Sequence, residues 1–352
     1  MQRILIARLS AMGDIVHSLP AVAALRRAFP QAVIGWAVEE RWVELLAARS
    51  AARSGPRSPQ RPLVDVIHTI DTRAWRSAPL SPATWRTMKS VVAELRAQNY
   101  DCAVDMQAAI RSALLNRLSR APHRFGFAQP REALAKIFYS RAVETPAKHV
   151  VEQGLQLAAA IIGEETLAVD FPLPCDAEAE AWTGAQANGQ EFVLMNPGAG
   201  WGAKRWPAER YAEVARVFGA EGMHVLVNCG PGEEALARQI AAAHPQRVTP
   251  VGCSLSQLLA LIRRAKLFIG GDTGPVHLAA ALRIPVVAIY GPTDPARNGP
   301  YGPLGINQNI VVLRSAESTT SHARRAAPES GLLQIAATDV LAAARGLLEQ
   351  KR

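Results

Sequence analysis

The stretch Leu267-Phe268-Ile269-Gly270-Gly271-Asp272-Thr273-Gly274-Pro275-Val276-His277 sets the fold class of this 352-residue chain. Its apolar run is typical of a buried strand, and Pro275 suits the first turn of a helix, where a missing N–H costs nothing. The paired glycines allow close approach to the backbone, and a first helical turn presents unpaired N–H groups with a partial positive charge. Such a turn binds anions, and the Thr273 hydroxyl and the His277 ring N–H add donors for phosphate oxygens. The pattern predicts a phosphate-binding turn in a parallel α/β domain, with a plain turn capped by Asp272 or Thr273 as the alternative.

A second glycine-rich loop spans residues 196–207 and also follows an apolar run. It contains Lys204 and Arg205, and Pro207 then begins a helix. Cations at such a place neutralise the charge that develops on a leaving diphosphate. The glycine spacing before Lys204 is not that of a Walker P-loop. The turn at Gly270 lacks the GxGxxG pattern, which argues against a standard dinucleotide site.

Strand and helix signals alternate in two series along the chain, which is typical of parallel sheets with crossover helices. The pattern breaks near Phe171-Pro172-Leu173-Pro174, so we expect two α/β domains, residues 1–172 and 173–335, and then a final helix. The first series has expected strands at 4–7, 32–38 and 102–105 and expected helices at 14–29, 84–98 and 110–118. The second has expected strands at 192–196, 224–228, 267–269 and 285–290 and expected helices at 208–218, 233–243, 255–265, 276–282 and 338–349.

Three segments, 51–62, 73–82 and 314–328, are arginine-bearing and lack apolar periodicity. We expect a mobile loop at 51–62 and irregular backbone in the other two. Basic loops on a regular scaffold are where substrate contacts tend to lie, although plain solvated loops are a fair alternative.

The opening at residues 9–20 places Gly13 and Asp14 where the first strand ends and a helix begins. Asp14 is either a helix cap, worth about 1 kcal/mol, or a general base. His17, one turn later, is as consistent with packing as with chemistry. The residues leave these alternatives open.

A carboxylate follows the expected strand at 224–228, in the run Gly230-Pro231-Gly232-Glu233-Glu234. It can accept hydrogen bonds from ribose hydroxyls, although Glu in a first helical turn is also favoured by the helix dipole. The sequence has no DxD, no HExxH and no Cys/His cluster. We therefore expect cationic side chains and helix dipoles, without a metal ion, to neutralise the charge of the diphosphate.

Composition fits a globular protein, with 49% apolar and 20% charged residues. The four cysteines stand far apart, which favours a reduced cytosolic compartment. No apolar run approaches the roughly 18 residues of a membrane span, and the first is too short for a signal peptide. The net charge of +9 fits either a solvated surface or an anionic partner.

These segments together resemble glycosyltransferase family 9, the heptosyltransferases that build the inner core of lipopolysaccharide. The resemblance spans nearly the whole chain. It is carried by residues 10–20, by Asp105-Met106-Gln107 with Arg111-Ser112-Ala113, by Pro130-Arg131-Glu132-Ala133-Leu134-Ala135 with Phe138-Tyr139, by Lys204-Arg205-Trp206-Pro207, by Asp272-Thr273-Gly274 with His277, and by Tyr290-Gly291-Pro292-Thr293-Asp294-Pro295.

The resemblance implies an α/β GT-B fold, in which two Rossmann-like parallel-sheet domains face each other across a cleft and the final helix, at about 336–352, joins the N-terminal domain. It implies a cytoplasmic enzyme, peripheral to the inner-membrane surface. The implied donor is ADP-L-glycero-β-D-manno-heptose, and the implied acceptor is a Kdo sugar of Kdo2-lipid A. Transfer would invert the anomeric carbon without a metal or other cofactor, and no nucleic acid partner is expected.

Residue roles follow from the same resemblance. Asp14 matches the base, Lys204 the diphosphate lysine, Thr273, Gly274 and His277 the phosphate-binding turn, Asp272 a further donor contact, and Glu233 (or Glu234) the ribose carboxylate. Arg73, Arg76, Arg111 and Arg131, with Arg124 and Lys136, are candidates for lipid A phosphates and Kdo carboxylates, because arginine binds both groups bidentately.

Two features depart from the family pattern. Ala199-Gly200 stands where hydroxyl residues are expected before the lysine, so some diphosphate contacts must be backbone N–H groups. The basic tract 314–325 is longer than expected and leaves the acceptor details open. The alternatives are a heptosyltransferase with a later core or other glycan acceptor, and a GT-B-like sugar-nucleotide epimerase.

Overall fold

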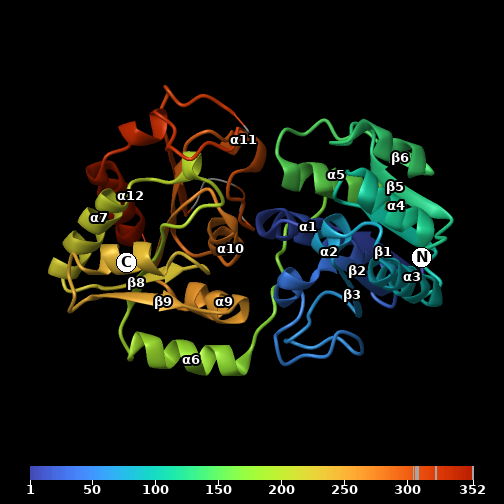
Figure 1. Cartoon of the computed structure of the whole chain (residues 1–352), viewed down its shortest axis with the longest axis horizontal. Coiled ribbons are helices and arrows are strands. Elements are labelled where there is room, and N and C mark those ends of the chain that lie inside the picture. The colour runs from blue at the N-terminus through green and yellow to red at the C-terminus, as the bar shows by residue number, and fades with distance from the viewer. Residues whose placement is uncertain (304, 306–308, 322, 351–352) are drawn as a thin grey trace. The chain divides into compact units, whose positions relative to one another are not determined.

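The computed structural model describes residues 1–303, 305, 309–321 and 323–350. Contacts divide the chain into two compact units, Met1–Cys175 and Asp176–Arg352, which are called here the first and the second domain (Figure 1). The division falls a few residues beyond the expected boundary at 172. Each domain is an α/β unit with a parallel sheet, as the alternating sequence pattern predicted.

The first domain is built on a six-stranded sheet with the order β3-β2-β1-β4-β5-β6, in which every pairing is parallel. Its strands are β1 (Arg3–Ala7), β2 (Val33–Glu39), β3 (Val66–Ile70), β4 (Cys102–Asp105), β5 (His123–Phe127) and β6 (Arg141–Val143). Its helices are α1 (Met12–Ala28), α2 (Thr72–Ser77), α3 (Pro82–Ala97), α4 (Ile110–Leu118) and α5 (Val150–Ile162), with 3-10 turns η1 (Glu40–Leu45) and η2 (Ala133–Phe138). Ile4, Leu5 and Ile6 of β1 are fully buried, as expected for a strand with helices on both faces.

The second domain repeats this plan, with the order β12-β11-β10-β7-β8-β9 and parallel pairings throughout. Its strands are β7 (Phe192–Asn196), β8 (His224–Cys229), β9 (Val248–Gly252), β10 (Leu267–Gly271), β11 (Val286–Tyr290) and β12 (Ile310–Arg314). Its helices are α6 (Ala177–Ala187), α7 (Ala208–Ala220), α8 (Glu234–Ala241), α9 (Leu255–Arg264), α10 (Gly274–Ala281), α11 (Pro295–Asn298) and α12 (Ala337–Glu349), with 3-10 turns η3 (Gly202–Lys204) and η4 (Gly331–Gln334).

Strand order reverses direction once in each sheet, between β1 and β4 in the first domain and between β7 and β10 in the second. Loops that leave the carboxyl ends of neighbouring strands diverge at such a switch point, and ligands of open parallel sheets bind there. The loops that follow β7 and β10 contain Lys204 and Asp272. Asp14 lies in the first turn of α1, directly after the loop that follows β1, and Gln107 lies in the loop between β4 and α4.

The final helix differs from the expectation that it joins the first domain. Val340, Leu341, Ala344 and Leu347 of α12 are buried in the hydrophobic core of the second domain. The helix packs against α7, β10, β11 and β12, and Figure 1 shows it beside α7. The spacing of its apolar residues makes one face that matches this sheet, so α12 belongs to the second domain. Residues 351–352 of the expected helix lie outside the described part of the chain.

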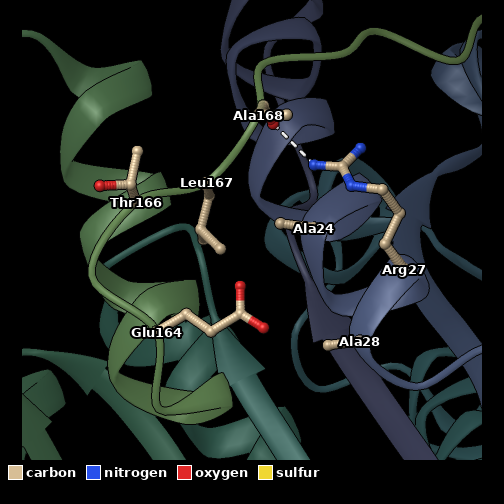
Figure 2. Close-up of a pocket in the computed structure, with 7 residues that line it drawn as sticks. All are labelled: Ala24, Arg27, Ala28, Glu164, Thr166, Leu167 and Ala168. Carbon is tan, nitrogen blue, oxygen red and sulfur yellow. Dashed lines mark hydrogen bonds between the residues drawn. The ribbon is translucent and has the colours of Figure 1, made fainter.

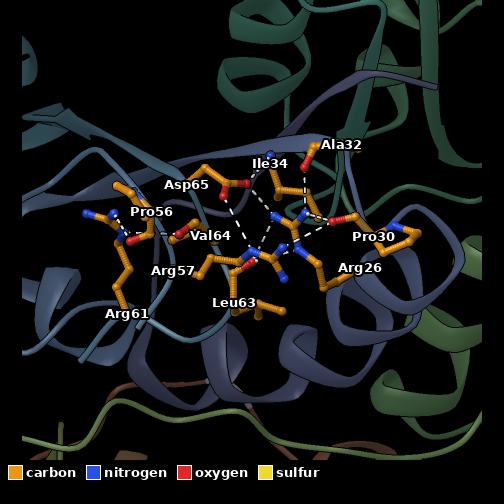
Figure 3. A network of polar contacts seen from close by, with 10 residues as sticks. All are labelled: Arg26, Pro30, Ala32, Ile34, Pro56, Arg57, Arg61, Leu63, Val64 and Asp65. Carbon is orange, nitrogen blue, oxygen red and sulfur yellow. Dashed lines mark hydrogen bonds and ion pairs between the residues drawn. The ribbon is translucent and has the colours of Figure 1, made fainter. Parts of the chain in front are cut away.

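The 51–62 stretch contains no helix, as expected for a loop, and the buried Arg61 is hydrogen-bonded to its backbone. Arg61 donates to the carbonyl oxygens of Val64 at 3.1 Å, Pro56 at 2.8 Å and Ala52. Figure 3 shows the adjoining network, in which Asp65 pairs with Arg26 and lies 3.6 Å from Arg57. Satisfied backbone carbonyls hold this loop against β3 and the end of α1.

Other irregular segments also contain structure. The first half of the 73–82 stretch lies in α2, which Asp71 caps by accepting the N–H of Ala74. The polar stretch that follows Pro174 forms α6, which begins at its cap Asp176. The basic segment begins at Arg314, the last residue of strand β12, and position 322 within it lies outside the described residues.

The segment that follows α5 is tied back to α1. Arg27 donates to the carbonyl oxygen of Ala168 at 2.6 Å. Figure 2 shows the hollow beside this contact, with Leu167 and Glu164 opposite the end of α1. Its volume is about 320 Å³.

Candidate active site

A buried ion pair joins the two switch-point loops of the second domain. Asp272 comes directly after β10, and its carboxylate pairs with the ammonium group of Lys204, in the η3 turn after β7. The two side chains are only 5% and 11% exposed, respectively. The Thr293 hydroxyl also donates to Asp272, and His277 Nε2 lies 3.8 Å from Asp272 Oδ1. Three of the predicted donor residues, Lys204, Asp272 and His277, therefore meet at one point.

The surroundings of Asp272 keep it ionised. Burial alone would raise its pKa, but the hydrogen bond from His277 and the charge of Lys204 hold the pKa well below its ordinary value. Burial, followed by the Asp272 charge, raises the pKa of the Tyr290 hydroxyl behind it. The site thus holds an ionised Asp272 carboxylate in contact with the Lys204 side chain.

The first turn of α10 has no side-chain cap. Thr273 is its N-cap residue in extended conformation, but neither its hydroxyl nor another side chain caps the helix. Gly274 and Pro275 form the first turn, as the sequence predicted. The plain capped turn is therefore not what the structure shows, and the N-terminus of α10 is available to an anion.

A row of polar side chains fixes this turn to the rest of the sheet. Cys253 Sγ lies 3.2 Å from Asn228 Oδ1, Asn228 Nδ2 donates to Asn196 Oδ1 at 2.6 Å, and Asn196 Nδ2 lies 3.5 Å from Thr273 Oγ1. The row follows the strand order from the end of β9 across β8 and β7 to β10. Sequence reasoning missed Asn196 and Asn228. Their signal was an amide at or near the carboxyl end of two successive apolar strands.

Glu233, the predicted ribose carboxylate, faces the loop after β7. Its Oε2 accepts the N–H of Gly230 at 3.0 Å. A Cβ atom at Gly198 would overlap this carboxylate, so a side chain at position 198 would displace it from the loop. Glu234 instead lies exposed and accepts from the N–H of Gly232 at 3.1 Å. The geometry therefore favours Glu233 over Glu234 at this loop.

The carboxylate of Asp14, in the first domain, helps to cap the start of α1 and is also partly exposed. Oδ2 accepts the N–H of Ala11 at 3.2 Å, and Oδ1 is 2.9 Å from Arg8 Nη2. The side chain is 42% exposed, so it remains open to a ligand as well as holding the start of α1. The helix cap and the general base are thus compatible roles for the same carboxylate.

The segment after β4 holds the Asp14 loop in place. Gln107 Oε1 accepts the N–H of Leu9 at 2.9 Å and of Ser10 at 3.3 Å, and Arg8 donates to the carbonyl oxygen of Met106. Asp105 accepts the Tyr139 hydroxyl at 2.7 Å and the N–H of Gln107 at 2.9 Å. Burial raises the pKa of Asp105 against these hydrogen bonds. The Asp105-Met106-Gln107 motif therefore positions the base candidate.

The predicted acceptor arginines follow three strands of the first sheet. Arg73 and Arg76 lie on α2 after β3, Arg111 on α4 after β4, and Arg131 in the loop after β5. Arg73, Arg76 and Arg131 are exposed, and Arg111 is half-buried.

Two further cations differ in their surroundings. Arg124 donates to the carbonyl oxygens of Phe138 at 2.9 Å and Ala121 at 2.8 Å. Its guanidinium is therefore committed to the backbone, unlike that of Arg73 or Arg131. Lys136 lies exposed on η2.

Within the described residues, no group of His, Cys, Asp and Glu side chains is arranged to hold a metal ion. No helix among them is both long and apolar enough to cross a membrane.

Comparison with known proteins matches residues 88–331 to the profile of Glycosyltransferase family 9 (heptosyltransferase). Lipopolysaccharide heptosyltransferase 1 of Escherichia coli strain K12 is 29% identical over 327 residues, covering 89% of this chain and 93% of that protein. The protein of the same name from Salmonella typhimurium is 30% identical over 312 residues, covering 85% of this chain and 92% of that protein. The structure of E. coli heptosyltransferase WaaC with ADP matches with a TM-score of 0.79 and 26% identity, over 100% of both chains.

Asp272→Asn tests whether the buried pair holds the two loops together. The change leaves the Lys204 ammonium uncompensated, and we expect a loss of about 3–5 kcal/mol in the free energy of unfolding by urea at pH 7. Because the folded pKa of Asp272 is depressed, this contribution is present above the ordinary Asp pKa of about 3.9 and declines as the pH falls below it.

The matched control is Glu221→Gln, which breaks the exposed pair between Glu221 and Arg345. It should cost less than about 1 kcal/mol. Equal losses in the two variants would contradict the structural importance of the Lys204–Asp272 pair.

Proposed function

Because this chain belongs to glycosyltransferase family 9, the heptosyltransferases, we propose that it transfers L-glycero-D-manno-heptose from ADP-heptose to the Kdo of Kdo2-lipid A, as a heptosyltransferase I. The observation that carries the proposal is the uncapped N-terminus of α10 beside the Lys204–Asp272 pair. Solved structures of WaaC with ADP and with ADP-2-deoxy-2-fluoro heptose support ADP-heptose as the donor.

On the donor side, the diphosphate binds at the start of α10. The backbone N–H of Gly274 and the side chains of Thr273 and His277 bind its oxygens, and Lys204 offsets the charge that grows as ADP leaves. Glu233 binds the ribose hydroxyls. Asp272 acts mainly by holding the Lys204 ammonium in place, because its own carboxylate is buried and paired.

On the acceptor side, Asp14 accepts the proton of the Kdo hydroxyl. The hydroxyl oxygen then attacks the anomeric carbon while the bond from that carbon to the diphosphate oxygen breaks. A single displacement of this kind inverts the anomeric configuration. Arg8 and the Ala11 N–H hold the carboxylate for this step.

The anionic groups of the acceptor suit the basic loops of the first domain. Arg73, Arg76, Arg111 and Arg131 would bind lipid A phosphates and the Kdo carboxylate, because a guanidinium group pairs with either through two parallel hydrogen bonds. We do not include Arg124 in this set, because its guanidinium already donates hydrogen bonds to backbone carbonyl oxygens.

An exposed apolar patch on the first domain supports a lipid-linked acceptor and a location at the cytoplasmic face of the inner membrane. Leu134 and Ile137 of η2 are 63% and 71% exposed, and η2 packs against α4, where Ile110 and Leu114 are also exposed. In the sequence, Arg131 precedes Leu134 and Ile137, and Lys136 lies between them. Exposed apolar side chains accompanied by cations suit an anionic lipid surface.

Acceptor-dependent release of ADP tests the function. Purified protein with ADP-heptose and Kdo2-lipid A should release ADP, and omission of the acceptor should stop the release. Release without acceptor would favour an epimerase or hydrolase. Activity on an already heptosylated acceptor, with none on Kdo2-lipid A, would favour a later step of core assembly.

Asp14→Asn separates a base from a cap. Asparagine still accepts the Ala11 N–H, so the start of α1 is preserved, but it cannot take the proton. We expect kcat to fall by about 10²–10⁴-fold, with an unchanged dissociation constant for ADP-heptose. If the variant keeps the rate of the wild type, Asp14 is only a cap.

Leu134→Ser combined with Ile137→Ser tests the membrane patch. Each side chain gains on the order of 1.5–3 kcal/mol from full burial, so the pair of changes should weaken co-sedimentation with anionic phospholipid vesicles by at least about tenfold. Leu80→Ser is the control, because Leu80 is 88% exposed and lies between α2 and α3, outside η2 and α4. Equal sedimentation of all three proteins would rule this surface out.

A further inference from the structure

The basic segment that follows β12, whose role the sequence left open, is attached to the loop that contains Lys204. The N–H of Ala203 donates to the carbonyl oxygen of Arg325 at 3.0 Å, and the N–H of Glu329 donates to the carbonyl oxygen of Ala203 at 3.2 Å. Ala203 lies at the centre of η3, one residue before Lys204. Two backbone hydrogen bonds, one donated and one accepted by Ala203, therefore fix the position of this segment against the loop that contains Lys204.

Gly202 makes this close contact possible. A Cβ atom at position 202 would overlap the carbonyl oxygen of Ala326. Because that neighbour is backbone rather than a flexible side chain, a larger residue would push the segment away from η3. The glycine preceding Ala203 and Lys204 is thus explained by the segment and not by the turn alone.

Glu329, whose backbone N–H contacts Ala203, ties the start of the segment to its end. Its carboxylate accepts the Ser318 hydroxyl at 3.1 Å, the N–H of Thr319 at 3.2 Å and the N–H of Leu332 at 2.9 Å. Burial would raise its pKa, but these hydrogen bonds hold the pKa below its ordinary value. An ionised Glu329 therefore fastens the segment close to where it contacts Ala203.

The segment brings a second cation to the site. The Arg324 guanidinium carbon lies 5.4 Å from the centre of the Trp201 ring, and Lys204 Nζ lies 4.4 Å from the same centre. Both cations lie within cation–π range of the same ring, so Trp201 places each of them at the loop that contains Lys204.

Charge at this point is not balanced. Asp272 compensates Lys204, whereas Arg324 is exposed and forms no ion pair with any acidic side chain in the described ranges. The partial positive charge at the start of α10 adds to this excess. An anion that binds here offsets this excess positive charge. A guanidinium group can donate to two phosphate oxygens at once, which an ammonium group does less well.

We propose that Arg324, stacked on Trp201, is a donor-binding residue that contacts the diphosphate of the nucleotide-sugar beside Lys204. The inference rests on the proposed function, because it assumes a nucleoside diphosphate at the start of α10. It extends the donor site to a third loop, which lies far along the chain from the other two.

Calorimetric titration of the full-length protein with ADP and, separately, with AMP tests this role. Arg324→Gln should weaken ADP binding by about tenfold to a hundredfold, the loss expected for a charge-assisted contact, and should weaken AMP binding much less. Arg325→Gln is the matched control. It removes the same charge from the neighbouring residue, whose contact with Ala203 is made by its backbone, and should leave both affinities close to those of the wild type.

The outcomes separate the two proposals. If the wild type binds ADP and Arg324→Gln binds it as tightly as Arg325→Gln does, the role of Arg324 is refuted while the nucleotide site stands. If Arg324→Gln lowers the affinities for ADP and for AMP equally, Arg324 does not contact the second phosphate and the diphosphate contact is refuted. If the wild type binds neither nucleotide, both the proposed function and this inference fail.

Discussion

The ion pair between Lys204 and Asp272 is the interaction on which the rest of the candidate site depends. A buried ion pair contributes little net stability compared with apolar packing, but it is costly to break, so its importance lies in where it holds its two charges. Here it joins the loops after β7 and β10 at the switch point of the second sheet. The Asn228–Asn196 row, the uncapped start of α10 and the segment at Arg324 are all arranged around that junction.

The first domain also joins two neighbouring loops at its switch point, but it does so with different residues. Its switch point lies between β1 and β4, and Gln107 and Arg8 join the two loops there, through the N–H groups of Leu9 and Ser10 and the carbonyl oxygen of Met106. Asp14 is thereby fixed yet remains 42% exposed. Both domains thus use buried polar contacts between adjacent loops to hold a reactive or charged group at the carboxyl edge of a parallel sheet.

Much of this could be predicted from the sequence, because apolar runs followed by Gly, Pro and a polar residue are local signals. The strand-to-helix turn at 267–277 and the approximate bounds of α7, α9 and β11 required nothing else. The features that the sequence did not predict depend on contacts between residues that are far apart along the chain. No local pattern assigns α12 to the second domain, since only the shape of the sheet selects its partner. The Asn196–Asn228 bond and the contact between Ala203 and Arg325 join residues far apart in sequence, and the buried role of Arg61 could not be distinguished from a solvated arginine.

We propose that Lys204, fixed by Asp272, marks a diphosphate site. The most direct measurement is the affinity of ADP relative to AMP for the wild type and for Lys204→Met, with Lys266→Met as the control because Lys266 forms an exposed pair with Glu191. We expect Lys204→Met to lower the affinity for ADP by at least about tenfold and to reduce the preference for ADP over AMP, and we expect Lys266→Met to change neither. An unchanged preference for ADP in Lys204→Met would contradict this proposal.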